Sequence, residues 1–258
     1  MLSCSVNPNP RLSPLLAFAG NVKRPWSNTV SLTEGDKGMN SDDGKPPSFE
    51  FAGKVYIHGP DHGNFYLRMF ENLGFIPART LEEADVVCFT GGADVDPQLY
   101  GERALTMTHF DTRRDSEDID VWAMVEDNPL VLKVGICRGA QFLNVMNGGT
   151  LWQDVNHHAL TDGHKVLDTR TGQSWVVSST HHQMMRPSKD GEILAWAVQA
   201  TYKKSEKETL VGQKGDVGVD PEVVYYAETN SLCFQPHPEF PEFEECLEYF
   251  ANLLYEHY

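Results

Sequence analysis

The stretch LVLKVGICRGAQFLNVMNGG, residues 130–149, decides the fold because an apolar run passes directly into a helical pattern. Its first part predicts a strand over 130–136, and its second part predicts a helix over 138–147 that ends before two glycines. Cys137 stands at the junction, between Gly135 and Gly139. This G-x-C-x-G pattern has the form of a nucleophile elbow, a strained strand-to-helix turn that exposes its middle side chain. The alternative interpretation is that Cys137 is only a small residue that fits a tight turn.

The start of the predicted helix favours reactivity at Cys137. Unpaired N–H groups and the positive end of the helix dipole stabilise a thiolate over a thiol. The backbone N–H of Arg138 is the first predicted donor to an oxyanion at this turn. A second donor is expected in TGGAD, residues 90–94, which follows another apolar strand; Gly92 is the expected donor and Gly91 the alternative.

Strand and helix patterns alternate along the chain from residue 51 onward. Strands are predicted at 54–59 and 84–92, and helices at 64–75 and at 113–128, the latter with Ile119, Trp122 and Ala123 facing inward. Further strands are expected at SWVVSS, EILAWAVQ, VVYYAE and LCFQ, followed by a last helix that opens at Pro241. This alternation predicts an α/β fold with a mainly parallel sheet and helices on both faces. Ligands of such sheets bind beyond the carboxyl ends of the strands, where Cys137 is expected.

A candidate base for Cys137 lies in FQPHPEF, residues 234–240. Pro238 favours an extended path, so His237 and Glu239 project to the same side of the chain. Glu239 would then orient one imidazole nitrogen of His237 and leave the other for the nucleophile. By itself, a histidine beside two prolines is more often a surface turn residue. An elbow cysteine together with a later His-x-Glu favours nucleophilic catalysis.

Composition limits the classes of partner. The chain of 258 residues has 37 acidic and 21 basic residues, a formal net charge of −16 and a pI near 4.9. No basic stripe is visible, so we expect neither a nucleic-acid partner nor an anionic membrane partner. No apolar run approaches the roughly 20 residues that cross a bilayer. The five scattered cysteines lack CxxC spacing, which is typical of a reduced, cytoplasmic protein.

Residues 1–48 differ from the rest of the chain. They are rich in Ser, Pro, Asn and Gly and have no apolar periodicity, which predicts a disordered tail. A misassigned start, with Met39 as the first residue, is an alternative, and so is an organelle-targeting segment. Residues 49–258 are expected to form a single catalytic domain.

Three separated motifs resemble a known family. GICRGAQFLNV…GGTLWQDV, TGGADVDPQLYGE and PHPE occur in the order found in class I glutamine amidotransferases, and are most similar to the γ-glutamyl hydrolase-like branch, the peptidase C26 group. The resemblance implies a flavodoxin-like doubly wound fold and a catalytic triad of Cys137, His237 and Glu239. It also implies hydrolysis of a γ-glutamyl amide through a glutamyl thioester.

The resemblance also implies substrate contacts. Residues at or near the substrate would be Gln141, His181, His182 and Gln183. One departure stands at Pro236, where the family usually has an aromatic residue before the catalytic histidine. Without that aromatic residue, the imidazole of His237 lacks an aromatic side chain to pack against at this position.

Three functions remain open at this point. The first is a free-standing hydrolase that acts on glutamine or a small γ-glutamyl compound. The second is a glutaminase subunit that delivers ammonia to a separate synthetase or amidoligase. The third is a regulatory binding module with weak or no catalysis, which the intact motif residues disfavour. The sequence leaves a homodimer open.

No cofactor or metal is expected. The histidines of DVNHHALTDGH (His157, His158 and His164) and the later pair at 181 and 182 match no compact zinc spacing. The run KKSEKE, residues 203–208, predicts a solvated loop. Cys88, Cys233 and Cys246 lie in apolar stripes and are expected to be core thiols.

Overall fold

The computed structural model describes residues 52–258. The expectations for the tail at 1–48, including an alternative start at Met39, lie outside the described residues. Within the described part, no helix is long and apolar enough to cross a membrane.

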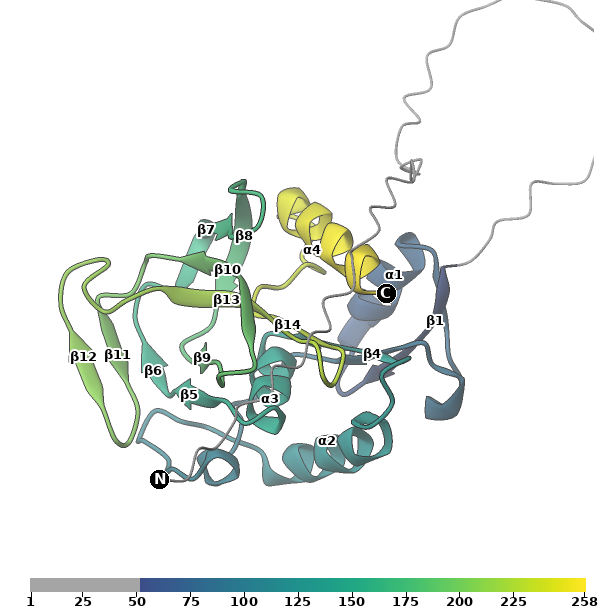
Figure 1. The fold of residues 1–258 in the computed structure, drawn as a ribbon, viewed down its shortest axis with the longest axis horizontal. Coiled ribbons are helices and arrows are strands. Elements are labelled where there is room, and N and C mark those ends of the chain that lie inside the picture. The colour runs from purple at the N-terminus through teal and green to yellow at the C-terminus, as the bar shows by residue number, and fades with distance from the viewer. Residues whose placement is uncertain (1–51) are drawn as a thin grey trace, which may run out of the picture. The chain divides into compact units, whose positions relative to one another are not determined.

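A nine-stranded sheet forms the centre of the described domain (Figure 1), in the order β2-β1-β3-β4-β14-β13-β10-β7-β8. The first five strands are parallel. They are β2 (Phe75–Pro77), β1 (Gly53–His58), β3 (Val86–Phe89), β4 (Leu132–Ile136) and β14 (Ser231–Phe234). The other four extend the sheet in antiparallel pairs. They are β13 (Asp220–Tyr226), β10 (Glu192–Ala197), β7 (Ala159–Asp168) and β8 (Ser174–Thr180).

Two small sheets lie beside the antiparallel half. One pairs β5 (Thr150–Trp152) with β9 (Met184–Arg186), and the other joins β6 (Asp154–Val155), β11 (Tyr202–Lys204) and β12 (Thr209–Val211). Three short 3₁₀ turns connect elements of the parallel half: η1 (His62–Asn64), η2 (Leu81–Glu83) and η3 (Pro97–Tyr100).

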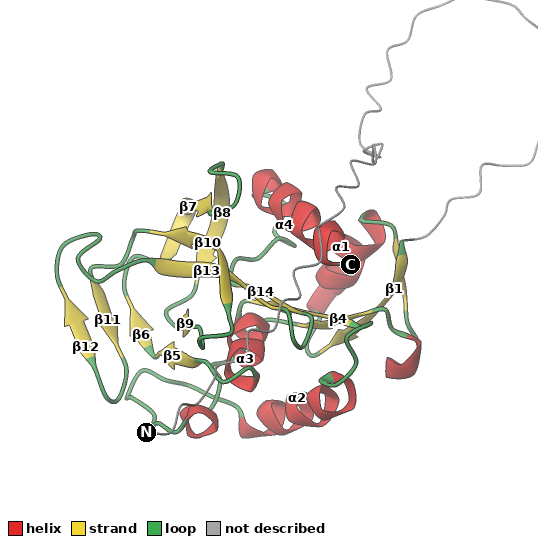
Figure 2. Cartoon of the chain, in the orientation of Figure 1, coloured by secondary structure: helices red, strands yellow, loops and turns green. Residues whose placement is uncertain are grey.

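Helices cover both faces of the parallel strands (Figure 2). The apolar stripes of α1 (Phe65–Asn72) and α4 (Glu244–His257) pack with one face, and those of α2 (Thr112–Val125) and α3 (Arg138–Met146) with the other. Because both faces are covered, the central strands β3, β4 and β14 are buried along their whole length. The predicted α/β, doubly wound fold is confirmed.

Several local expectations differ from the structure. The last helix begins at Glu244 and not at Pro241, because residues 241–243 form a turn that leads into it. On α2, Ala123 is exposed, whereas Arg114 and Asp118 lie on the buried face. Lys203 is buried in β11, although its run of charges predicted a solvated loop. For Asp118 and Lys203, pairing with Arg138 and Asp220 from distant segments decides burial over the local pattern.

The carboxyl ends of the parallel strands bring the predicted motifs to one edge. Cys137 directly follows β4, residues 90–92 follow β3, and residues 235–237 follow β14. Since these three strands are neighbours and point the same way, the motifs meet at that edge. The three core cysteines are buried, as predicted: Cys88, Cys233 and Cys246.

Candidate active site

The turn at Cys137 has the backbone of an elbow. Cys137 adopts φ 53° and ψ −109°, a conformation that costs a non-glycine residue about 1–3 kcal/mol. A β-carbon on Gly135 would collide with the backbone of Gly139, and one on Gly139 would collide with the carbonyl of Phe89. The structure therefore requires glycine on both sides of Cys137, because helix α3 starts in direct contact with strands β4 and β3.

His237 is held by three contacts at the end of β14. Its backbone N–H donates to Ser178 Oγ of β8 at 2.6 Å, and its Nδ1 lies 2.6 Å from Glu239 Oε1. The ring of Phe240 stacks on the imidazole, with centroids 4.6 Å apart and planes 6° from parallel. Phe240 thus supplies an aromatic wall although Pro236 replaces the usual aromatic residue. Neither Phe240 nor Ser178 was predicted from the sequence to contact His237.

Cys137 and His237 lie together against the turn after β3. A β-carbon placed on Gly91 would be 3.1 Å from Cε1 of His237 and 3.8 Å from Cβ of Cys137. Burial lowers the pKa of His237, but the charge of Cys137 and hydrogen bonds with Cys137 and Glu239 outweigh it and raise this pKa to about 10. The surroundings of His237 therefore favour the imidazolium form.

The same turn carries the two backbone N–H groups that the sequence analysis considered as oxyanion donors, those of Gly91 and Gly92. The N–H of Gly91 donates to the hydroxyl of Tyr66 at 3.1 Å, so it is already engaged. Gly92, the donor expected from the sequence, is the next N–H along the turn. Arg138 is the first residue of α3, and its N–H has no acceptor four residues earlier within that helix.

Comparison with known proteins agrees with this arrangement. A model of the family described as peptidase C26 matches residues 75–212, which is more than half of the chain. The chain belongs to the peptidase C26 family. It is a member of the class I glutamine amidotransferase-like superfamily, as the motifs predicted. The matched range includes Cys137 and ends before His237.

Individual relatives cover only parts of this C26 chain. The protein YvdE of Lactococcus lactis, named as glutamine amidotransferase-like, is 32% identical over 123 residues, which are 40% of the chain and 51% of YvdE. A Schizosaccharomyces pombe protein, provisionally named glutamine amidotransferase PB2B2.05, is 35% identical over 115 residues, or 43% of the chain and 42% of that protein. The chain spans about half the length of these curated relatives.

Solved structures support the fold of the C26 chain. A Thermoplasma acidophilum protein, provisionally named as one of the subunits of GMP synthase, superposes with a TM-score of 0.50 at 14% sequence identity. The superposition covers 79% of the chain and 96% of that structure. At this identity the likeness concerns the fold alone.

A buried charge network lies behind the elbow of the C26 chain. Arg138 pairs with Asp115 and Asp118 of α2, and Arg114 Nε lies 2.7 Å from Asp118 Oδ1. Burial and the nearby charge of Arg114 lower the pKa of His58 to about 4, so His58 is neutral and contacts Asp118 at 2.8 Å. The RRDSED segment contains the Arg114–Asp118 pair at i,i+4 spacing, which was the available sequence signal.

This network also holds the turn that would form the oxyanion hole. The guanidinium of Arg114 donates to the carbonyl of Thr90 at 3.1 Å and to that of Gly91 at 3.5 Å. Asp118 therefore connects the turn after β3, through Arg114, with the first residue of α3, through Arg138. Two segments that are distant in sequence are fixed relative to each other by one carboxylate.

The predicted substrate-contacting residues occupy different surroundings. Gln141 Nε2 donates to Gln183 O and to Gln235 Oε1, both at 3.2 Å, so it joins α3 to the loop after β8. His182 lies 3.1 Å from Asp94 and is partly exposed, whereas His181 is buried and faces Glu222. The substrate-contacting roles of these residues stay predictions.

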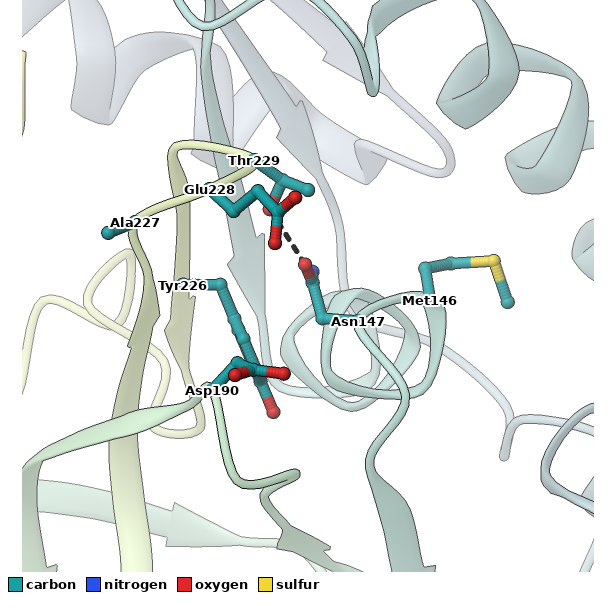
Figure 3. Close-up of a pocket in the computed structure, with 7 residues that line it drawn as sticks. All are labelled: Met146, Asn147, Asp190, Tyr226, Ala227, Glu228 and Thr229. Atoms are coloured by element: carbon teal, nitrogen blue, oxygen red, sulfur yellow. Dashed lines mark hydrogen bonds between the residues drawn. The ribbon is translucent and has the colours of Figure 1, made fainter. Parts of the chain in front are cut away.

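Two cavities of the described domain differ in their position relative to the elbow. The larger, of about 450 Å³, is lined by Met146, Asn147, Asp190 and residues 226–229 (Figure 3). Its lining includes no cysteine or histidine, and it lies at the end of α3 that is remote from Cys137. A smaller cavity of about 240 Å³ is lined by Glu239 and Phe240.

Ser178 is a positioning residue that can be tested. Ser178→Ala removes the acceptor of the His237 N–H and is expected to lower kcat about tenfold, with KM changed less than twofold. The matched control is Ser179→Ala: Ser179 is also buried, but its hydroxyl has no hydrogen-bond partner within residues 52–258. Steady-state kinetics of both variants distinguish a positioning role of the Ser178 hydroxyl from the general effect of removing a buried hydroxyl. Equal losses of kcat would contradict the positioning role of Ser178.

Proposed function

We propose that this chain hydrolyses γ-glutamyl amides through a covalent glutamyl thioester on Cys137. The observation that carries the proposal is the elbow cysteine beside an imidazole that is buttressed by a carboxylate, with His237 Nδ1 2.6 Å from Glu239 Oε1. Membership in the C26 family supports the reaction class.

The first half of the reaction forms the thioester. His237 accepts the thiol proton, and the thiolate of Cys137 attacks the γ-carbonyl carbon of the substrate. Negative charge develops on the carbonyl oxygen, which the N–H groups of Gly92 and Arg138 stabilise; one such donor contributes about 3 kcal/mol. The C–N bond then breaks as the imidazolium of His237 gives its proton to the leaving amine.

The second half releases glutamate. His237, now neutral, takes a proton from water, and the resulting hydroxide attacks the thioester carbonyl. The C–S bond breaks, and the thiolate of Cys137 is restored beside the imidazolium. In this scheme Glu239 keeps its charge throughout and holds the ring of His237 in the productive orientation.

A substrate panel tests the proposal. Purified full-length chain is incubated with glutamine and with a set of γ-glutamyl amines, and glutamate release is measured by a coupled assay. Release from a γ-glutamyl amine and little release from glutamine indicates a free-standing hydrolase. Weak glutaminase activity that rises on addition of an ammonia-consuming synthetase indicates a delivering subunit. No glutamate from any member of the panel would contradict the proposal.

The pH dependence of kcat/KM tests the role of His237. Protonation of the leaving group needs the imidazolium form of His237. Burial lowers the pKa of His237, but its contacts with Cys137 and Glu239 outweigh burial and raise this pKa to about 10. Activity is therefore retained through neutral pH and falls as pH rises through about 10. Glu239→Gln removes one charge that favours the imidazolium, so its alkaline limb moves to lower pH. This role would be contradicted if the alkaline limb of the wild-type profile lay near pH 6.5, or if the alkaline limb of Glu239→Gln lay at the same pH as that of the wild type.

A further inference from the structure

A second cluster of polar side chains is buried in the antiparallel half of the sheet. His158 precedes β7, His164 lies on β7, His181 follows β8, and Glu222 lies on β13. Their side chains are at most 3% exposed. The bulge at Gly163 directs His164 inward: Gly163 has φ 66°, and a β-carbon there would collide with the carbonyl of Val177. The reaction steps proposed above use none of these four side chains, although the family resemblance placed His181 at or near the substrate.

The histidine nitrogens converge on the carboxylate of Glu222. His158 Nδ1 lies 3.2 Å and His164 Nε2 lies 3.0 Å from Glu222 Oε1, and His181 Nε2 lies 3.6 Å from Oε2. Within the described part of the chain, none of these atoms has a hydrogen-bond partner of acceptable geometry. Buried polar atoms without partners cost about 1–3 kcal/mol each, so this many of them in one place point to a missing group.

Contacts on the far side of two rings show how His181 and His158 face Glu222. His181 Nδ1 lies 2.8 Å from the carbonyl of Gln183, which can only accept, so this nitrogen carries the proton. His158 Nε2 lies 3.1 Å from Asp220 Oδ2, which is likewise an acceptor. In neutral His181 the nitrogen that faces Glu222 therefore presents a lone pair to its carboxylate, whereas His158, with a carboxylate on each side, satisfies both of them only as an imidazolium. A metal cation bound to these side chains would take the place of the proton between His158 and Glu222.

We propose that His158 Nδ1, His164 Nε2 and the carboxylate of Glu222 bind a divalent transition-metal ion of the zinc type. Candidate ligand atoms of these three residues lie within 4.8 Å of one another, and they form the one such group of His, Cys, Asp or Glu in residues 52–258. Ligands of a tetrahedral zinc ion are about 3.3–3.5 Å apart. The distances from Glu222 Oε1 to His158 Nδ1 and to His164 Nε2 need to widen by only a few tenths of an ångström to reach this value.

The donor set selects the class of ion. Imidazole nitrogens suit zinc, cobalt, nickel and copper, whereas magnesium and calcium require sites rich in oxygen. Asp220 supplies the outer contact that metal-binding histidines usually have, and Lys203 Nζ binds its other oxygen at 2.7 Å. Because the three ligands come from β7, the residue before it and β13, and have almost no exposure, the site would be enclosed by the sheet.

The metal would also stabilise the loop that follows β8. His181 extends from that loop toward Glu222, and the carbonyl of Gln183 that fixes its ring also accepts from Gln141 of α3. A bound ion would thus connect the antiparallel half of the sheet with the helix that begins after Cys137.

Metal content and thermal stability test the site. Tag-free full-length protein, purified without chelator, is expected to contain about one equivalent of metal by mass spectrometry. Removal of the metal is expected to lower Tm by about 5–10 °C, and added zinc, but not magnesium, restores it. Cobalt(II) reconstitution is expected to give visible d–d bands without thiolate charge-transfer bands, since the ligands are nitrogen and oxygen.

Four variants test whether the proposed residues, and not other side chains of the protein, bind the metal. Glu222→Gln and His164→Gln are expected to weaken metal affinity at least about tenfold. Two controls should keep the metal: His157→Asn changes the exposed neighbour of His158 and tolerates its φ of 61°, and Cys137→Ala removes the elbow thiol. Wild-type protein that contains no metal and binds no added zinc or cobalt would overturn the proposal, as would thiolate charge-transfer bands. Because these tests use the wild type, a variant that fails to fold does not affect them.

Discussion

Glutamate release is expected to fall by a factor on the order of 10⁴ or more in Cys137→Ala, because the variant has no atom that can form the thioester. The fold should be retained, since the elbow strain at φ 53° is a property of the backbone and the side chain is only partly buried. Rates with the best substrate of the γ-glutamyl panel measure the loss directly. Intact mass spectrometry of quenched reactions should detect a glutamyl adduct in the wild type alone.

The control for this variant is another cysteine of the same sheet. Cys233 is fully buried on β14, and Cys233→Ala removes a thiol from the core without touching the elbow. Its activity is expected to stay within about twofold of wild type when it is assayed below its melting temperature, because its thiol only fills space. If Cys137→Ala keeps its turnover, the nucleophile is another group.

The second large effect is a loss of stability on removal of the Asp118 carboxylate. Asp118→Ala leaves Arg114 and Arg138 close together and buried without the carboxylate that they share, and the free energy of unfolding is expected to fall by about 3–5 kcal/mol. Burial and the charge of Arg114 already lower the pKa of Arg138 to about 10, so this guanidinium depends on its acidic partners. Urea unfolding monitored by fluorescence measures the change.

Glu117→Ala is the matched control for Asp118. Glu117 precedes Asp118 on α2, pairs with the exposed Arg113 at 2.8 Å, and is itself half-exposed. Its removal is expected to change stability by less than about 0.5 kcal/mol. Asp118→Ala should also lower kcat at temperatures where the protein stays folded, because Arg114 no longer aligns the carbonyl of Thr90. Equal stability of the two variants would contradict the role assigned to Asp118.

The two predictions differ in what the sequence could reveal about them. Cys137 stands between glycines at a change from strand to helix pattern, and all of this information lies within ten residues. Asp118 lies on a helix whose charges suggest a solvated face. The i,i+4 spacing with Arg114 indicates a pair on the helix, but the burial of Asp118 depends on Arg138, which comes from another helix, so the local pattern could not predict that burial.

Local sequence was sufficient to predict the alternation of strands and helices, the elbow at Cys137 and the pairing of His237 with Glu239. These features depend on side-chain periodicity, on glycine at positions without room for a β-carbon, and on a two-residue spacing. The folded chain was needed to show that Phe240 stacks on His237, that Asp118 pairs with Arg138, and that Glu222 meets three histidines. The last two contacts join segments that the order of strands in the sheet brings together, and their energy depends on burial, which exists only once the chain has folded.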